Sequence, residues 1–408
     1  MILSKSQQRG MELFKEGKNI FISGPAGTGK SHLISEIYKE CRGNIQVCAT
    51  TGCAASLLQC VGAKTIHSWS GIGSGVGSSR DVISRINTNK KIMNQWKKIN
   101  ILVIDEISML SAKTFTLLDD VAKSIRSNPY PFGGIQVILT GDFYQLPPIG
   151  NQNDPMSCAF CFESERWGST IDQVIELTTC FRHADELYAT IMNEVRIGVM
   201  TKKNNDILKS RVTKCDKDHP HCIIYPNRYK VDRLNNDRLH KLDPETQHIY
   251  TPISSNPRYN VHRHEPVELR VGAEVMCTAN IETFGVHYLV NGTPGRVVAF
   301  RDELPVVSFR SGITRVIGHH EFPTEIEDVH VIHIPLMLAW AITIHKSQGI
   351  TLQSAEIDAG SGIFECGQTY VALSRLKTLD GLYLSGYDVS KIKVNKKVKR
   401  FYKELSTE

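Results

Sequence analysis

Short apolar runs alternate along the chain with longer stretches of helical periodicity. Residues 20–23, 45–49 and 100–104 are rich in aliphatic side chains, as strands buried on both faces of a sheet are. Between such runs, as in residues 32–41, apolar side chains recur every three or four positions, which indicates helices with one buried face. This order predicts an α/β protein with parallel sheets covered by helices. We expect strands at 20–23, 45–49, 100–104, 133–139, 222–225, 354–357 and 381–384, and helices at 3–16, 32–41, 107–126, 184–197, 204–211, 228–240, 339–348 and 367–375.

A different pattern fills residues 268–317. Short β segments are separated there by turn sequences such as Asn291-Gly292. Several short strands with regular turns predict a small barrel, inserted into a second α/β unit that starts at Val174. Residues 243–266, rich in Pro, His, Asn and Ser, are expected to be a connector. The predicted β segments are 268–280, 289–290, 295–300, 305–309 and 315–317.

The most specific motif is a phosphate-binding loop. Eight residues match the pattern G-x-x-x-x-G-K-[ST] in full and stand between a predicted strand and a predicted helix. Glycines allow successive backbone N–H groups to surround a phosphate chain at the positive end of a helix. In such loops the lysine reaches the β- and γ-phosphates of a nucleoside triphosphate, and the final hydroxyl ligates Mg²⁺. The loop consists of Gly24, Pro25, Ala26, Gly27, Thr28, Gly29, Lys30 and Ser31.

Two other predicted strands end in polar residues that suit the same chemistry. Asp105 and Glu106 follow the apolar strand 100–104, which is a typical setting for Mg²⁺ binding and activation of a water molecule. Gln145 follows strand 133–139. Its spacing fits a residue that senses the γ-phosphate and orients water, and it fits an ordinary turn glutamine equally well.

The composition is compatible with a nucleic-acid partner but does not require one. The 408 residues are 41% hydrophobic and 22% charged, and the formal net charge is +6. Residues 80–98 contain six Lys or Arg and one acidic residue. Such a basic insertion is more often a solvated face than a binding surface.

No stretch has the pattern of a signal peptide or of a membrane span. The most apolar long stretch, residues 331–344, is interrupted by His333 and Pro335 and is too short to cross a bilayer. Eleven cysteines in a chain of this length do not resemble a secreted disulfide framework. We therefore expect a soluble protein of a reducing compartment, cytoplasm or nucleus, without a membrane partner; a viral or organellar origin stays open.

Two groups of Cys and His residues, more than fifty positions apart, are weak candidates for a zinc site. Because the chain has no second C-x-x-C pair, free thiols and a polar loop are the expected interpretation. The basic segment 396–400 is expected to be a solvated helix end rather than a targeting signal or a DNA contact. The Cys and His candidates are Cys158, Cys161, Cys215, His219, His221 and Cys222.

Further segments line up in order along the chain, among them Asp105-Glu106, His345-Lys346-Ser347-Gln348-Gly349 and Ser374-Arg375. With them the chain resembles the PIF1-like family of DNA helicases, in superfamily one. The resemblance extends from residue 3 to about residue 384, which is nearly the whole chain. Its segments are the Q motif (3–7), motif I (24–31), motif Ia (50–55), a strand-contacting segment (65–75), motif II (103–109), a family signature (117–134), motif III (140–148), motif IV (180–182), motif V (341–351) and motif VI (370–375).

The resemblance implies two RecA-like P-loop domains that hold ATP in the cleft between them. The first domain would be residues 1–175, with a small basic insertion at 63–99 where the family carries a strand-separating wedge. The second would be residues 176–258 and 325–408, interrupted by an SH3-like β-barrel at 259–324. Because the motifs begin and end near the ends of the sequence, we expect a helicase core without extensions.

The resemblance also assigns roles around ATP. Glu106 would be the general base, Ser31 and Asp105 would ligate Mg²⁺, and Arg182 and Arg375 would reach in from the second domain as arginine fingers. Taken alone, each arginine fits a structural ion pair; inside these motifs the finger is favoured. The expected catalytic residues are Lys30, Asp105, Glu106, Gln145, Arg182 and Arg375, and the expected ATP-binding residues are Gln7, which would read the adenine, Gly24, Pro25, Ala26, Gly27, Thr28, Gly29, Lys30, Ser31, Gln145, Arg182, Gly349 and Arg375.

Single-stranded DNA would lie across both domains. Hydroxyls and a lysine suit phosphates, while Trp69 would either stack on a base or belong to the core. ATP-driven opening and closing would move the protein from five-prime to three-prime, a direction that rests on the resemblance alone. The expected DNA contacts are Thr51, Gly52, His67, Trp69, Pro148, His345, Lys346 and Ser347.

The prediction is therefore an ATP-dependent DNA helicase, a monomer in solution, that acts on single-stranded, forked or partially duplex DNA in replication, repair or recombination. One alternative is a RecD-like subunit of a larger complex, which the signature at 117–134 disfavours. Another is a strand-binding protein that ATP switches without unwinding, which the presence of Glu106, Arg182 and Arg375 disfavours. The preferred DNA structure and the step size stay open.

Overall fold

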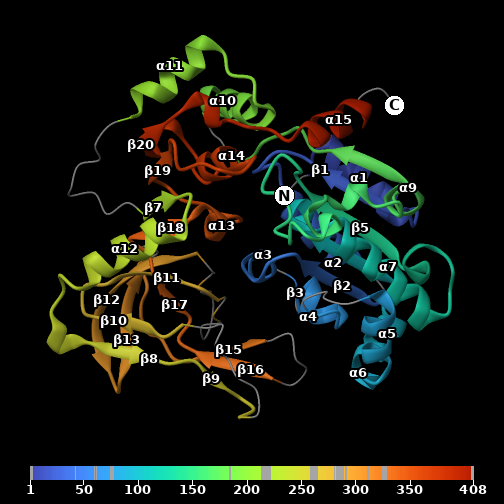
Figure 1. The fold of residues 1–408 in the computed structure, drawn as a ribbon, viewed down its shortest axis with the longest axis horizontal. Coiled ribbons are helices and arrows are strands. Elements are labelled where there is room, and N and C mark those ends of the chain that lie inside the picture. Colours follow the sequence, from blue (N-terminus) through green and yellow to red (C-terminus); the bar gives the residue numbers. More distant parts are fainter. Residues whose placement is uncertain are drawn as a thin grey trace. The chain divides into compact units, whose positions relative to one another are not determined.

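The computed structural model contains two compact units (Figure 1). Unit 1 comprises Met1–Val199, Glu365–Tyr370 and Ile392–Glu408, and unit 2 comprises Met200–Phe364 and Val371–Lys391. Among the residues described, no helix combines the length and the apolar character needed to cross a membrane. The structure describes residues 3–41, 43–58, 60, 62–73, 78–182, 185–212, 222–257, 265–279, 281, 289, 292–309, 312–323 and 329–405.

A parallel sheet of the RecA-like type forms the centre of unit 1. In the described part of this unit its strand order is β3-β2-β4-β5-β1-β6, and every pair of neighbours is parallel. The central strands β1 and β4 are buried along their whole length, as the apolar runs predict. The strands are β1 (Ile20–Ser23), β2 (Ile45–Ala49), β3 (Lys64–Thr65), β4 (Ile101–Asp105), β5 (Gln136–Gly141) and β6 (Gln173–Glu176).

Helices pack against this sheet through their apolar faces. Leu13 of α1 and Leu33, Ile34 and Ile37 of α2 share one core with residues of β1, β2 and β4. Ser4 caps α1 in a reciprocal capping box with Gln7. The helices of unit 1 are α1 (Lys5–Lys15), α2 (Lys30–Glu40), α3 (Gly52–Leu57), α4 (Ile66–Ser70), α5 (Ser79–Asn87), α6 (Lys90–Lys98), α7 (Ala112–Arg126), α8 (Pro155–Cys158), α9 (Trp167–Thr170), α10 (Glu186–Ile197) and α15 (Lys396–Leu405).

Two predictions about unit 1 are wrong and one is confirmed. The helix expected at 107–126 starts only at Ala112, because Ser111 accepts a hydrogen bond from the Thr114 N–H and caps the helix there. The second α/β unit does not start at Val174, because β6 pairs with β1. The prediction for the basic segment 396–400 is confirmed, because it forms the first part of α15 with its four Lys and Arg side chains exposed and only Val398 buried.

Unit 2 contains a second parallel sheet, in the order β18-β7-β19-β20 among its described residues. Asn235 of α12 ties this sheet to the helix: its amide donates to the Ala341 carbonyl (3.0 Å) and accepts from the Ala341 N–H (2.9 Å). The predicted helix at 339–348 is therefore wrong, because residues 341–343 pair with β7 as a strand. The elements are β7 (Cys222–Tyr225), β18 (Ala341–Thr343), β19 (Ala355–Ala359), β20 (Leu382–Tyr387), α11 (Lys202–Ser210), α12 (Arg228–Leu239), α13 (Ile344–Ser347) and α14 (Gln368–Leu373), which begins in unit 1.

The β-rich part of unit 2 has its own core. Antiparallel strands in the order β14-β13-β12-β11-β17 enclose buried residues such as Val275, Val297 and Val307. Two strands of the predicted connector, β8 and β9, pair with β10 and β16. Of the β segment predicted at 289–290, only Leu289 lies within the described residues. The strands are β8 (His248–Tyr250), β9 (Ile253–Ser254), β10 (Val267–Leu269), β11 (Glu274–Cys277), β12 (Pro294–Arg301), β13 (Leu304–Phe309), β14 (Thr314–Val316), β15 (His320–Pro323), β16 (His330–His333) and β17 (Leu336–Leu338).

The carboxylate of Asp119 holds the signature loop that follows α7. It is fully buried, accepts from the Phe132 N–H (2.7 Å) and pairs with Lys123 (2.6 Å). Phe132 adopts a left-handed conformation (φ 48°), which is unfavourable for a residue with a side chain unless its surroundings impose it.

We expect Asp119→Ala to destabilise unit 1 by about 3 kcal/mol, because it leaves a buried N–H and a lysine without their partner. Urea unfolding followed by tryptophan fluorescence measures the change. Glu12→Ala, which removes an exposed carboxylate paired with Arg9, is the matched control and should stay close to the parent protein. Equal stability of the two variants would contradict this role for Asp119.

Candidate nucleotide site and strand contacts

The phosphate loop joins β1 to α2 in a conformation that requires glycine. Gly27 and Gly29 have φ values of +85° and +81°. A Cβ atom on Gly27 would lie 2.4 Å from the Cβ of Arg182, and one on Gly29 would lie 2.6 Å from Nε2 of Gln7. No side chain caps the N-terminus of α2. The loop thus leaves the positive end of α2 for an anion.

Lys30 folds back onto the loop. Its ammonium donates to the carbonyl oxygens of Gly24 (2.6 Å) and Pro25 (3.0 Å). Burial lowers the pKa of Lys30, although the negative charges of Asp142, Glu106 and Asp105 oppose that shift. The ammonium group of Lys30 therefore lies near three carboxylates, but its hydrogen bonds go to neutral carbonyl oxygens. A phosphate group is a stronger hydrogen-bond partner for a cation and would replace these carbonyls.

Asp105 and Glu106 lie at the carboxyl end of β4, as predicted. The Thr140 hydroxyl and the Glu106 N–H (2.8 Å) both donate to Oδ1 of Asp105. Burial, followed by the neighbouring charge of Glu106, raises the pKa of Asp105 to about 6. Both bonds reach the same oxygen, so the arrangement suits a carboxylate that offers Oδ2 to a cation. Ser31 is exposed at the first turn of α2.

Gln145 lies in a turn after β5, with its side chain buried. Its backbone N–H donates to the Asp142 carbonyl (2.9 Å). Whether it also senses a γ-phosphate stays a prediction.

The segment 180–182 crosses the phosphate loop. The Phe181 N–H donates to the Gly27 carbonyl (2.8 Å), and Gln7 donates to the Gly29 carbonyl (3.3 Å). The exposed ring of Phe181, which the sequence analysis did not single out, lies near Gly29 beside Gln7. Burial lowers the pKa of Arg182. Arg182 thus lies in the same compact unit as the phosphate loop, and not in the second domain as predicted.

A buried polar network that the sequence analysis missed contacts the phosphate loop at Ala26. The Tyr370 hydroxyl accepts from the Ala26 N–H (2.9 Å) and donates to Oδ2 of Asp142 (3.2 Å). Arg196 forms a bidentate pair with Asp142, with N–O distances of 2.9 and 3.1 Å. Burial disfavours the charge of Arg196, but Asp142 outweighs it and the pKa of Arg196 is raised. Pro25, Ala26, Arg196 and Tyr370 border a cavity of about 310 Å³.

The C-terminal helix joins the same network. The Tyr402 hydroxyl is 2.7 Å from Oγ of Ser23, the last residue of β1, and accepts from the Phe143 N–H (3.2 Å). Its ring stacks on Tyr144 with centroids 4.7 Å apart. Periodicity gives no sign of these contacts, because Tyr370 and Tyr402 are more than 200 residues away from their partners in the sequence.

The predicted DNA contacts of unit 1 differ in how exposed they are: Gly52 and His67 are at least partly accessible, whereas Trp69 and Pro148 are buried. Thr51 caps α3, and His67 lies half-buried on α4. Trp69 is only 2% exposed and packs on Trp96 with centroids 4.6 Å apart. The ring therefore fits the core role that the sequence left open, and in this conformation it is not accessible to a base. Gly52 is exposed and Pro148 buried.

The predicted residues of unit 2 lie together around α13. Lys346 is exposed, His345 is half-buried and Gly349 has a φ of +82°. Ser347 is fully buried, and its hydroxyl donates to the Ile344 carbonyl (2.7 Å) rather than pointing outward.

Arg375 is also turned inward. It is 2% exposed and donates to the carbonyl oxygens of Val371 (2.7 Å) and Ser347 (3.3 Å) and to the Ser374 hydroxyl (2.8 Å). These bonds connect motif VI to motif V inside unit 2. A role as an arginine finger stays a prediction, and it requires an exchange of these partners.

The sequence predicted two sets of metal ligands: the Cys and His residues that were weak candidates for zinc, and Ser31 with Asp105 for Mg²⁺. Among the described residues no group of three or more His, Cys, Asp or Glu side chains could hold an ion. Cys158 and Cys161 are free thiols, and Cys215, His219 and His221 lie outside the described residues. Mg²⁺ usually takes one or two protein ligands and completes its shell with phosphates and water, so Ser31 and Asp105 fit it.

The parallel sheets, the glycine loop and the paired carboxylates after β4 define a P-loop nucleotide-binding protein of the RecA-like type. The model of the family "PIF1-like helicase" matches residues 3–206. The chain belongs to this family.

Known relatives match over nearly the whole chain. An ATP-dependent DNA helicase PIF1 of Danio rerio is 35% identical over 421 residues, which is 100% of this chain and 64% of the relative. The crystal structure of a Pif1 helicase from Candida albicans has a TM-score of 0.86 at 34% identity, covering 99% of this chain and 100% of that one. A Bacteroides Pif1 helicase in complex with ADP-AlF3 and single-stranded DNA has a TM-score of 0.77 at 27% identity, covering 100% and 98%. The chain spans 57 to 68% of the length of the first curated relatives.

We expect Tyr370→Phe to weaken ATP binding about three- to tenfold, because the Ala26 N–H loses its acceptor and Asp142 loses one of its donors without a change in shape. Titration with a fluorescent ATP analogue measures the Kd. Tyr387→Phe removes a hydroxyl that donates to Asn205 in unit 2 (2.9 Å) and should leave the Kd unchanged. An unchanged Kd in Tyr370→Phe would show that the Ala26 contact does not position the loop.

Proposed function

We propose that the chain is an ATP-dependent DNA helicase that moves along single-stranded DNA from five-prime to three-prime and separates duplex DNA. The observation that carries this proposal is the phosphate loop with Lys30 among Asp105, Glu106 and Asp142, in a chain of the PIF1-like family. The names of its relatives as ATP-dependent DNA helicases, and the Bacteroides complex with ADP-AlF3 and single-stranded DNA, support the same reaction.

Nucleotide binding begins at the loop. The β- and γ-phosphates take the place of the Gly24 and Pro25 carbonyls as partners of Lys30. Gln7 and the ring of Phe181 flank the Gly29 end of the loop and contact the adenine. Ser31 and Asp105 would hold Mg²⁺, which would supply positive charge next to the phosphates.

Hydrolysis needs a base, an oriented water molecule and stabilisation of the developing charge. Glu106 accepts the proton of the attacking water, and Gln145 orients it. Arg182 lies against Gly27 and stabilises the transferring phosphoryl group from within unit 1. Arg375 joins from unit 2 after it exchanges its inward partners. The two arginines thus differ in role, since only one of them depends on the arrangement of the units.

The DNA strand contacts both units. In unit 1 the strand contacts Thr51, Gly52, His67 and Pro148. In unit 2 it contacts His345 and Lys346. We also propose that residues 63–99 are the strand-separating insertion, that residues 259–324 form an SH3-like barrel, and that the protein acts as a monomer. The first stretch of unit 1 ends at Val199, so the predicted boundary between the two RecA-like domains at residues 175 and 176 is moved there in the proposal.

We expect Lys30→Ala to lower DNA-stimulated ATP hydrolysis at least about hundredfold, because the transition state loses a buried cation. Lys39→Ala removes an exposed lysine from the same helix, where it pairs with Glu36, and is the matched control. Phosphate release and fluorescence anisotropy with oligothymidine measure hydrolysis and strand binding. Strand binding should persist in both variants.

Strand separation is tested on forked duplexes that carry a single overhang of either polarity. The parent protein with ATP should unwind the substrate with a five-prime overhang, and Lys30→Ala should unwind neither. Hydrolysis without unwinding would favour the alternative function, a strand-binding protein that ATP switches. Unwinding by Lys30→Ala would refute the proposed mechanism.

A further inference from the structure

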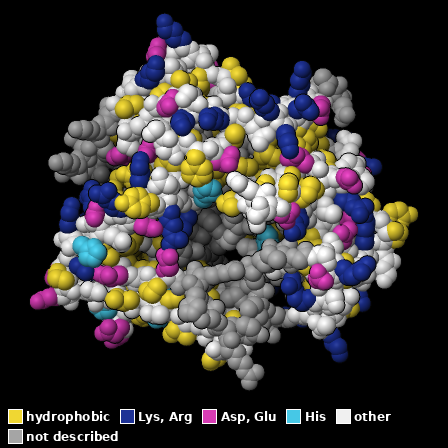
Figure 2. Space-filling view, in the orientation of Figure 1, with side chains coloured by type: hydrophobic (Ala, Val, Ile, Leu, Met, Phe, Trp, Pro, Cys, Tyr) yellow, Lys and Arg dark blue, Asp and Glu magenta, His cyan; other side chains and the backbone are white. Residues whose placement is uncertain are grey.

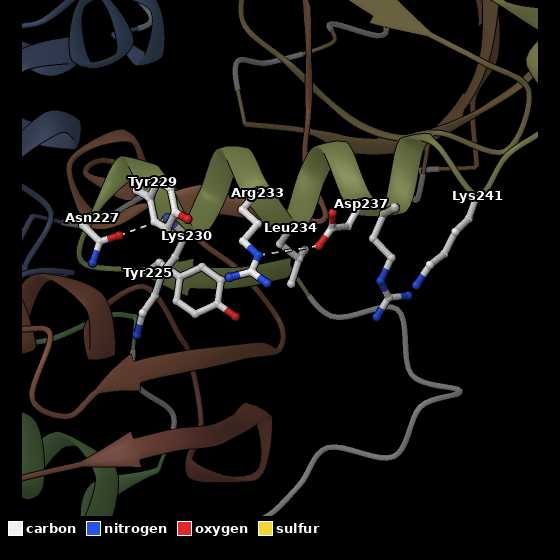
Figure 3. A pocket seen from close by; sticks show the side chains of 9 residues that line it. Tyr225, Asn227, Tyr229, Lys230, Arg233, Leu234, Asp237 and Lys241 are labelled. Carbon is white, nitrogen blue, oxygen red and sulfur yellow. Dashed lines mark hydrogen bonds and ion pairs between the residues drawn. The ribbon is translucent and has the colours of Figure 1, made fainter.

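Charge alone does not locate a binding surface on this protein. Figure 2 shows lysine and arginine side chains spread over the visible face, with acidic side chains among them. One feature of unit 2 is more specific. An open groove of about 560 Å³ runs along one side of α12 (Figure 3). Its lining includes the cations Lys230, Arg233, Arg238 and Lys241 and the rings of Tyr225 and Tyr229.

The sequence of α12 explains why this side of the helix is available. The helix buries Val231, Asn235 and Leu239 against the rest of unit 2. Figure 3 shows the lining side chains following one another along the helix, from Asn227 before its first turn to Lys241 after its last. Twelve helical residues at 1.5 Å per residue span about 18 Å. The groove is therefore long enough for a linear ligand.

The groove has a surplus of positive charge. Lys230 pairs with Asp358 (2.7 Å), and Arg233 lies 4.0 Å from Asp237, the one acidic residue in the lining. Arg238 and Lys241 have no carboxylate within ion-pair distance among the residues that the structure describes, although the charge of Arg238 acts on Glu356. Two cations are thus left to bind an anionic ligand.

Two aromatic rings, those of Tyr225 and Tyr229, line the groove together with these cations. Tyr229 is 73% exposed, and the Lys230 ammonium lies 5.6 Å from the centre of the Tyr225 ring. Phosphates require only the cations. An exposed ring such as that of Tyr229 suits unpaired bases, which can stack on an aromatic face whatever their sequence. The combination favours a single strand over a duplex, whose bases are already stacked on each other.

The groove also lies beside the proposed strand contacts of unit 2, because Tyr225 pairs in the sheet with Thr343, the residue that caps α13 before Lys346. Arg228, the first residue of α12, is close enough to Lys346 for its charge to act on that lysine. We propose that the α12 groove binds single-stranded nucleic acid as a continuation of the path past Lys346. At about 3.4 Å per nucleotide of a stacked strand, 18 Å accommodates about five nucleotides. The proposal rests on the proposed function, because it requires a strand at Lys346.

The double variant Arg238→Gln/Lys241→Gln tests it. Lys202→Gln/Lys203→Gln on exposed positions of α11 removes the same charge from the same unit and is the matched control. Anisotropy titrations use oligothymidine of about 8 and about 20 nucleotides at several salt concentrations. We expect the groove variant to bind the long strand about tenfold more weakly and the short strand normally. Its salt slope on the long strand should fall by about 1.4, the value for two lost phosphate contacts.

The ring contribution is tested by Tyr229→Ala, which should weaken binding of the long single strand about tenfold and leave binding of a blunt duplex unchanged. Parent-like affinity in the groove variant, an equal loss in the α11 control, or a loss on the duplex alone would overturn the proposal. If the parent protein itself binds no single strand, the proposed function fails instead, so the two failures are distinguishable.

Discussion

The buried ion pair between Asp142 and Arg196 is the contact on which the nucleotide site of unit 1 depends. Both side chains are almost fully inaccessible, and removing one partner of such a pair costs about 3–5 kcal/mol because the other charge stays buried. Asp142 lies three residues before Gln145, and its second contact is the hydroxyl of Tyr370. That hydroxyl holds the Ala26 N–H. One carboxylate thus connects motif III to the phosphate loop.

The Pro25–Ala26 peptide is held on both sides. Its carbonyl accepts from Lys30 and from the Thr28 hydroxyl (2.9 Å), and its N–H donates to Tyr370. If Lys30 turns to a phosphate, as proposed, the carbonyl keeps its bond from the Thr28 hydroxyl and the N–H keeps its bond to Tyr370. Burial raises the pKa of Tyr370, which keeps its hydroxyl protonated and able to donate to Asp142. The loop can therefore respond to nucleotide without losing its anchor.

Local patterns predicted local structure well. The strands at 20–23, 45–49 and 222–225 have the predicted bounds, and the phosphate loop lies where its motif requires. The wrong start of the helix at 107–126 has a local cause, the cap at Ser111, and the other errors arose where a distant partner decides the structure. Residues 341–343 have the periodicity of a helix but pair with β7, and β6 joins β1 across about 150 residues. The network around Tyr370 and Tyr402 could not be predicted for the same reason, because no local pattern reports a hydroxyl that bonds to a residue far away in the sequence.

Arg375 shows how unit 2 could link the two proposed activities. Its guanidinium donates to the carbonyl oxygen of Ser347, next to the exposed Lys346, and also to that of Ile350 (3.5 Å). A guanidinium drawn toward a γ-phosphate must give up these carbonyls, and the segment after α13 then loses the contacts that fix its position. Because α12 is tied to the adjoining strand β18 through Asn235 and Ala341, a shift of that segment acts next to the groove of α12. In the proposed function, the coupling between nucleotide state and strand contact therefore requires only the hydrogen bonds of Arg375 and no long pathway.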